Sequence, residues 1–83
     1  MNGKVVFISK LNGFVAIKTD DGNYTVVDNI SGSAIETNDV ISGDLGNLTA
    51  TSIKNVSKCK DIAVIVKDSL CDEETAKFLL SIQ

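Results

Sequence analysis

Two short apolar segments separated by a tight turn constrain the fold of this chain most. Residues 4–9 and 14–19 each have the length and the Val, Ile and Phe content of a β-strand, and Asn12-Gly13 lies between them. A second turn signal, Asp20-Asp21-Gly22-Asn23, precedes another strand-like segment, Tyr24–Asp28. Glycine and asparagine tolerate the positive φ angles that tight hairpin turns require. The first part of the chain is therefore predicted to form a three-stranded antiparallel meander.

The following residues add further strands but no second domain. A polar connection over 29–38 leads to strands predicted at 39–45 and 51–57, and Ile53 and Val56 are expected to supply apolar contacts in the second of these. A chain of 83 residues makes one domain. Such a domain buries only somewhat over ~60% of the surface that its unfolded form exposes. This size excludes a deep catalytic cleft between domains.

The opening hairpin resembles that of the cold-shock domain, a small five-stranded barrel of the OB type that binds single-stranded nucleic acid. The first strand matches the family pattern at Gly3-Lys4-Val5-Val6-Phe7, and the second matches it at Asn12-Gly13-Phe14-Val15-Ala16-Ile17. A shorter match, Lys54-Asn55-Val56, lies near the predicted fifth strand. The resemblance covers about residues 3–58. It implies a mainly β fold with a small closed antiparallel OB-like barrel of five to six strands.

The chain after this barrel departs from a bare cold-shock domain. Between Ile62 and Val66 both the odd and the even positions of the segment 61–67 are apolar, which is typical of a strand covered on both faces. The predicted cover is a short C-terminal helix over 72–82, where Asp72 can cap the first turn. The apolar residues on or beside its packed side are Ala76, Phe78, Leu79, Leu80 and Ile82. We therefore expect a single domain, 1–83, whose helix packs on the barrel through the sixth strand.

Aromatic side chains, on which a cold-shock domain stacks bases, are few in this chain. Phe7 and Phe14 match aromatic positions of the family, whereas Ala16 stands where its motif has a second aromatic residue. Tyr24, one position out of register, is the only substitute in the third strand. Because stacking contributes about 1–3 kcal/mol per base, the affinity is expected to fall by orders of magnitude. Phe7 and Phe14 are either core residues of the barrel or exposed rings on one face.

Lysines are unevenly placed, although the formal net charge is -3. Residues 1–19 contain three lysines and no acidic residue, and residues 54–60 repeat this composition. If the fifth strand lies beside the first, these lysines gather into one positive surface. The alternative is that lysine only keeps strand edges soluble. The chain contains no arginine, so sequence-specific binding of duplex DNA is not expected.

Enzymatic and metal chemistry find little support in the sequence. The chain has no histidine, which removes the usual base near neutral pH and any Ser-His or Cys-His pair. Asp20-Asp21 and Glu73-Glu74 have structural explanations, in a turn and at a helix start. Cys59 and Cys71 are too few for a closed zinc site, and an extended run separates them, so we expect free, buried thiols. We therefore predict no enzyme, no metal and no cofactor.

The sequence shows no sign of a membrane or export segment. No apolar run reaches the ~18 to 20 residues that a spanning helix requires, and Met1-Asn2-Gly3-Lys4 does not begin a signal peptide. The Asn-x-Ser/Thr triplets at Asn23, Asn29, Asn47 and Asn55 are then chance occurrences. We expect a cytoplasmic protein of bacterial type without a membrane partner.

Two functions of different classes remain as hypotheses. The first is weak, sequence-tolerant binding of single-stranded RNA or DNA, with an affinity that falls steeply with salt. Its expected contact residues are Phe7, Phe14, Tyr24, Lys4, Lys10, Lys18 and Lys54. The second is a non-catalytic protein-protein interaction module, or a homodimer, that has lost nucleic-acid binding and docks a partner through a barrel edge or the terminal helix. A terminal helix that covers the ring-bearing face would favour the second hypothesis.

Overall fold

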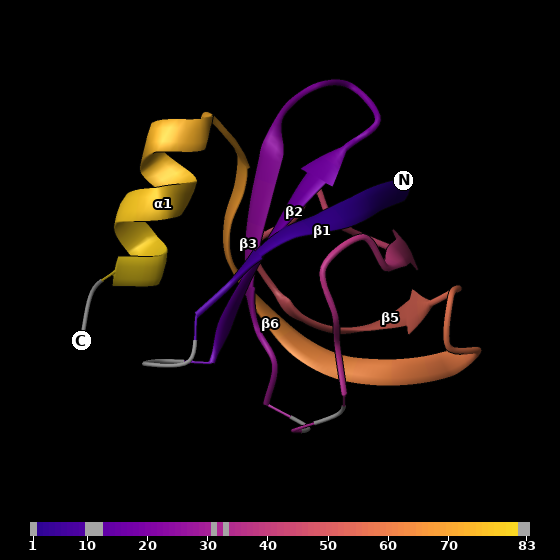
Figure 1. Cartoon of the computed structure of the whole chain (residues 1–83). Coiled ribbons are helices and arrows are strands. Elements are labelled where there is room, and N and C mark those ends of the chain that lie inside the picture. Colours follow the sequence, from indigo (N-terminus) through magenta and orange to yellow (C-terminus); the bar gives the residue numbers. More distant parts are fainter. Residues whose placement is uncertain (1, 10–12, 31, 33, 82–83) are drawn as a thin grey trace.

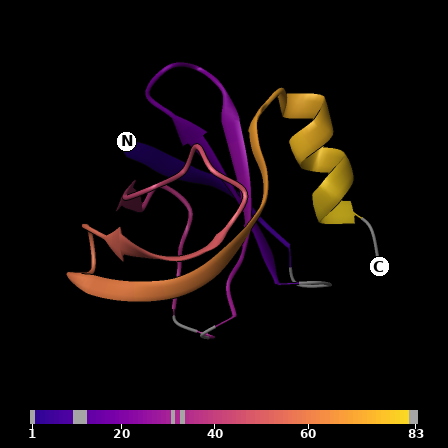
Figure 2. The ribbon, with the colours of Figure 1, turned by 180° about the vertical axis from the view of Figure 1, so that it is seen from behind.

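The strands of this protein close into a barrel, and one helix lies outside it (Figure 1 and Figure 2). The computed structural model describes residues 2–9, 13–30, 32 and 34–81. The elements are β1 (Asn2–Ile8), β2 (Phe14–Thr19), β3 (Tyr24–Asp28), β4 (Val40–Ser42), β5 (Ala50–Asn55), β6 (Lys60–Cys71) and α1 (Glu73–Ser81). Neighbouring strands follow the order β1-β2-β3-β6-β5-β4, all pairs are antiparallel, and β4 returns to pair with β1. The predicted mainly β fold, a closed antiparallel barrel with a short C-terminal helix, is confirmed.

The first three strands form the predicted meander. The turn between β2 and β3 is fixed by Thr19, whose N–H donates to the carbonyl oxygen of Asn23 at 2.8 Å. Asp21 accepts hydrogen bonds from the N–H of Asn23, at 3.1 Å, and from the Thr19 hydroxyl. Gly22 has a φ of 88°, which glycine adopts without strain. Of the predicted Asn12-Gly13 turn, residues 10–12 lie outside the described part of the chain.

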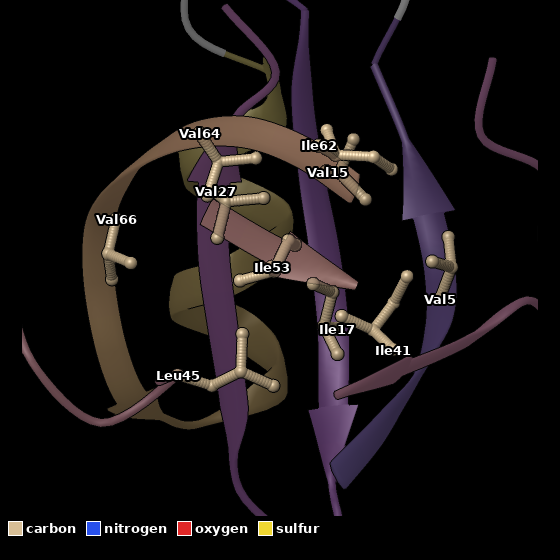
Figure 3. Packing of buried hydrophobic residues seen from close by; sticks show 10 residues of the cluster. All are labelled: Val5, Val15, Ile17, Val27, Ile41, Leu45, Ile53, Ile62, Val64 and Val66. Atoms are coloured by element: carbon tan, nitrogen blue, oxygen red, sulfur yellow. The ribbon is translucent and has the colours of Figure 1, made fainter. Parts of the chain in front are cut away.

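Aliphatic side chains fill the interior of the barrel. They come from every strand and from the loop after β4, and they point toward one another (Figure 3). The cluster consists of Val5, Val15, Ile17, Val27, Ile41, Leu45, Ile53, Ile62, Val64 and Val66. Full burial of each such side chain contributes about 1.5–3 kcal/mol, so this cluster is the main source of stability.

The fourth and fifth strands are shorter than predicted. β4 comprises only Val40–Ser42 of the expected 39–45. β5 ends at Asn55, and Val56 lies in the turn that follows, 45% exposed. Ile53 contributes to the interior as expected, but the prediction that Val56 would do so is wrong, because the strand ends before it.

β6 is longer than predicted and is covered differently. It runs over twelve residues and pairs with β5 through its first half and with β3 through its second half. Ile62, Val64 and Val66 point into the barrel, whereas Ala63 between them is exposed. The expectation that α1 covers the outer face of 61–67 is therefore wrong. The strand curves around the barrel, and α1 packs chiefly on β2 and β3 instead.

α1 begins where the sequence predicts. The Asp72 carboxylate accepts a hydrogen bond from the N–H of Thr75 at 2.8 Å, and this cap satisfies a backbone donor of the first turn. Ala76 and Leu80 are buried, but Phe78 is 63% exposed, so its predicted packing beside them is wrong. Ile82 lies outside the described residues. Within the described ranges, no helix has the length and apolar character needed to cross a membrane.

Candidate functional site

α1 covers the outer face of β1, β2 and β3, the face on which the predicted stacking residues lie (Figure 1). Directly paired residues of antiparallel strands point to the same face of a sheet. Phe7 pairs with Ala16, Ala16 with Val26, and Lys18 with Tyr24. We define the outer cluster as the buried residues of this contact, namely Ala16, Tyr24, Val26, Ala76 and Leu80. Val6, Phe7, Phe14, Cys71 and Leu79 pack against it.

A bulge in β1 places Phe7 on this outer face. Val5 pairs with Ile17 and points into the barrel, and strict alternation would turn Phe7 inward as well. The register instead shifts between Val5 and Phe7, so that Phe7 faces Ala16 on the outside. β-Bulges often re-aim a side chain in this way. The bulge thus decides that Phe7 is a surface residue of the barrel rather than a core residue.

Small side chains mark the place where α1 sits on the sheet. Ala16 stands where the cold-shock motif carries an aromatic residue, and it is fully buried. Ala76 of α1, in the same cluster, is also fully buried. Interiors are close-packed, so a ring at position 16 would need the space that α1 now fills. An aromatic residue at position 16 is therefore incompatible with the observed position of α1.

Tyr24 is a packing residue beneath α1 and not an exposed ring. It is only 8% exposed, and its hydroxyl donates a hydrogen bond to a carboxylate oxygen of Glu73 at 3.0 Å. This hydrogen bond raises the pKa of Tyr24. Hydrogen bonds from Lys77 and from Tyr24, in that order of importance, lower the pKa of Glu73. The contact ties the first turn of α1 to β3, so Tyr24 cannot stack a base while α1 is in place.

Phe7 and Phe14 are half-buried at the margins of α1, and each lies beside a lysine. The ammonium of Lys77 is 5.1 Å from the centre of the Phe7 ring, and that of Lys67 is 5.9 Å from the centre of the Phe14 ring. Both distances fit cation–π contacts. The sequence-based alternatives were core residues or freely exposed rings, and the two side chains are neither. Lys67 and Lys77 were missed because they approach from β6 and α1, far along the chain.

Lys4 and Lys18 form the positive part of the same outer face. They pair directly across β1 and β2, and both are exposed. Neither takes part in an ion pair with a described residue. Like charges directly opposite one another destabilise a sheet, so this position is favourable for an anion. Lys10, also predicted as a contact residue, lies outside the described residues.

The remaining lysines do not join this pair in one patch. β4 lies between β1 and β5, so the expected neighbourhood of the first and fifth strands is wrong. Lys54 pairs with Ser42 of β4 and therefore stands two strands from β1, about 10 Å at ~4.8 Å per strand. Lys58 is engaged elsewhere, since its ammonium lies 3.3 Å from a carboxylate oxygen of Asp39. Of the predicted lysines that the structure describes, only Lys4 and Lys18 are brought together.

An apolar hollow lies at the edge of the covered face. It has a volume of about 370 Å³ and is lined by Phe7, Ile8, Ser9, Lys77, Leu80 and Ser81. Phe78, which follows Lys77 of this lining on α1, is not itself part of the lining, and 63% of its surface is exposed. A second hollow, of about 250 Å³, includes Lys4 and Lys18 in its lining. Each of these two hollows combines apolar surface with at least one lysine, and the second also includes Asp20.

The cysteines do not form a reactive pair. Cys59, before β6, and Cys71, at its end, are both free. Cys59 is exposed, so the expectation that both thiols are buried is wrong for this residue. Burial, and then the nearby charge of Asp68, raise the pKa of the Cys71 thiol, which donates to the carbonyl oxygen of Tyr24 at 3.3 Å. Among the described residues, no group of three His, Cys, Asp or Glu side chains is placed to hold a metal ion.

Comparison with known proteins leaves the interpretation to the structure itself. No protein-family model, no curated protein and no solved structure matches this chain. The fold and the surface define a small closed antiparallel β-barrel that carries a helix on one outer face. Any function has to be argued from the surface around that helix.

Proposed function

We propose that this chain is an OB-like barrel that serves as a non-catalytic protein-interaction module, and that it binds a second copy of itself through α1 and the end of β1. The closed six-stranded antiparallel barrel is compatible with an OB-like fold. The observation that carries the proposal is the exposed Phe78 ring on α1, next in the chain to Lys77, which lines the apolar hollow between β1 and α1. A projecting side chain and a receiving hollow on one surface are what a two-fold symmetric interface needs, because each copy then supplies both parts.

The chemistry of the hollow favours a protein over a nucleic acid. Aromatic side chains that fill apolar pockets are typical anchors of protein interfaces. Among the described residues, Lys77 is the only charged residue in the lining, and it is paired with Glu73 at 3.0 Å, so this part of the hollow offers little attraction to phosphate. Ile8, 38% exposed, extends the apolar area toward the barrel. The net charge of -3 also opposes binding of a polyanion.

Sedimentation equilibrium over a wide range of concentrations tests the proposal. The wild-type chain is expected to show an average mass that rises toward that of a dimer. Phe78→Ala should weaken the dimer at least about tenfold, which corresponds to ~1.4 kcal/mol. Leu48→Ala is the matched control, because Leu48 is an apolar residue with similar exposure, 66%, outside this surface. A wild-type chain that stays monomeric at millimolar concentration, or equal weakening by both variants, would contradict the proposal.

A second candidate function is weak, sequence-tolerant binding of single-stranded nucleic acid. The observation that favours it is the exposed pair Lys4 and Lys18, which form no ion pair with a described residue and lie on the outer face that also carries the margins of Phe7 and Phe14. Titration of labelled oligouridine at several salt concentrations tests it. Lys18→Gln should reduce the dependence of log K on log salt by about 0.7, the value for one phosphate contact in a single strand. Lys60→Gln, which removes an exposed lysine at the start of β6, should leave this salt dependence unchanged. Equal changes in the salt dependence of the two variants would contradict this candidate.

A further inference from the structure

α1 covers a row of three aromatic side chains on the outer face of the barrel. Phe7, Phe14 and Tyr24 come from the three adjacent strands β1, β2 and β3. All three rings pack in or against the outer cluster, which contains Ala76 and Leu80 of α1. Without α1, these rings would form an exposed apolar strip across the sheet. Such a strip is the surface on which bases stack.

α1 and its cap also carry a net negative charge, as a nucleic acid does. Residues 72–81 contain three acidic residues and one lysine. The Glu73 carboxylate accepts a hydrogen bond from the hydroxyl of Tyr24 at 3.0 Å. The charge of Lys18 also contributes to the lowered pKa of Glu73, after the stronger effects of Lys77 and Tyr24. The helix therefore presents apolar groups to the rings and a carboxylate to the neighbourhood of Lys18, as bases and phosphates would.

The contact that holds α1 is small enough to open. Of its nine residues, only Ala76 and Leu80 are buried. None of the strand pairs of the barrel depends on α1. An isolated helix of this length is not stable in water, so a helix that leaves the surface also unfolds. Opening is then a local event that leaves the barrel intact.

We propose that α1 is an autoinhibitory cover, an intramolecular mimic of single-stranded nucleic acid that has to leave the face of β1, β2 and β3 before the rings can bind bases. The proposal rests on the single-strand binding put forward above as the second candidate function. In the covered arrangement a strand contacts Lys4, Lys18 and the margins of two rings, and binding is weak. With α1 displaced, Phe7, Phe14 and Tyr24 all become accessible, and binding is stronger.

The test compares two substitutions of one exposed residue in the full chain. Phe78→Pro breaks α1 from within, because proline removes a backbone hydrogen bond and clashes with the preceding turn. Phe78→Ala removes the same ring and keeps the helix, since alanine favours helix. Both variants lose the Phe78 ring, so any effect of that ring on dimerisation is the same in each. Amide hydrogen exchange establishes that α1 is open in the proline variant and that the strands remain protected.

Affinity for a labelled oligouridine at low salt is the readout. Phe78→Pro is expected to bind at least about tenfold more tightly than Phe78→Ala, as the release of one or more stacking rings would give. Adding Phe14→Ala to the proline variant should remove most of that gain. Equal affinities of the proline and alanine variants, with α1 open in the former, would overturn the cover. No binding by any variant would overturn the single-strand function itself.

A milder variant serves if the proline variant does not fold. Asp72→Ala removes the cap that accepts the N–H of Thr75, and so frays the first turn of α1. Loss of such a cap should open α1 enough to increase affinity about twofold to fivefold. Glu74→Ala, at an exposed position of the same turn, is its control. If the α1 amides exchange faster in Asp72→Ala but the two variants bind oligouridine with equal affinity, the proposal that α1 is an autoinhibitory cover is also wrong.

Discussion

Replacement of Asp39 by alanine should lower the free energy of unfolding by about 3 kcal/mol, because this carboxylate closes the barrel. Its Oδ2 accepts hydrogen bonds from the side-chain amide of Asn55 on β5, at 2.9 Å, and from the N–H of Glu36, at 3.0 Å. The backbone carbonyl oxygen of Asp39 accepts a hydrogen bond from the N–H of Val5 on β1 at 2.9 Å. One residue thus holds together β1, β5 and the connection that leads into β4.

The magnitude follows from burial. Asn55 is fully buried, so Asp39→Ala leaves the NH2 group of its side chain without its acceptor, at a cost of about 1–3 kcal/mol. The lost hydrogen bonds to a charged acceptor contribute about 1.5–3 kcal/mol each before compensation by water. The contribution of Lys58 is smaller, because its hydrogen bond and its charge rank after the hydrogen bonds of Asn55 and Glu36 among the causes that lower the pKa of Asp39. Asp39→Asn keeps an oxygen acceptor and should cost only about 1 kcal/mol.

Acid provides an independent check on the same group. The hydrogen bond from Asn55, followed by that from the Glu36 backbone, lowers the pKa of Asp39 below its ordinary value of 3.8. The ionised form is thus favoured in the folded state, so its contribution is complete above the unfolded pKa and is lost as the pH falls through the folded pKa. Urea unfolding between pH 7 and pH 3, followed by circular dichroism, should show a steeper loss below about pH 4 in the wild type than in Asp39→Asn. Equal acid slopes, or a loss under ~1 kcal/mol in Asp39→Ala at pH 7, would refute the reasoning.

Three further predictions follow from the two clusters and the thiols. Leu45→Ala, in the fully buried interior, should lower the free energy of unfolding in urea by about 4 kcal/mol, and Leu80→Ala should lower it by about 2 kcal/mol. Only Leu80→Ala should speed hydrogen exchange of the α1 amides. A larger loss of stability in Leu80→Ala than in Leu45→Ala would contradict the assignment of the main core. Ala16→Phe should overpack the outer cluster by about 1–3 kcal/mol and increase exchange of the same amides, whereas unchanged exchange would show that α1 does not need the space. Iodoacetamide should modify Cys59 at least about tenfold faster than Cys71, because the Cys71 thiol is half-buried with a raised pKa; equal rates in the two single-cysteine variants would contradict its burial.

Local signals in the sequence were sufficient for most elements of the fold. The bounds of β2 and β3 agree with the predicted 14–19 and 24–28, because strand propensity and the turn at Asp21 and Gly22 act over a few residues. The start of α1 was predicted from its cap for the same reason. A strand was predicted at 39–45, but the position of β4 between β1 and β5 was missed, because its pairing with β1 joins residues that are far apart in the sequence.

The environment of the candidate site depended on distant contacts and was predicted less well. The sequence identified Phe7 and Phe14 but not whether they face inward or outward. Phe7 faces outward because of a register shift in β1, for which the local sequence gives no signal. The position of α1 over Tyr24 could not be predicted either, since the continuous apolar run of β6 suggested a different surface for the helix to cover.

The placement of the aromatic residues is the strongest argument that the surface around α1 has a function. Aromatic side chains usually dominate the stability of a core. Here the interior cluster contains only Val, Ile and Leu, whereas all four aromatic residues of the chain lie outside it. Phe7, Phe14 and Tyr24 line the outer face, and Phe78 is exposed on the helix. Barrel stability does not require rings there, because aliphatic residues could form the same cover. Rings that are concentrated on one covered face, beside two lysines that form no ion pair with a described residue, support the proposal that a ligand alternates with α1.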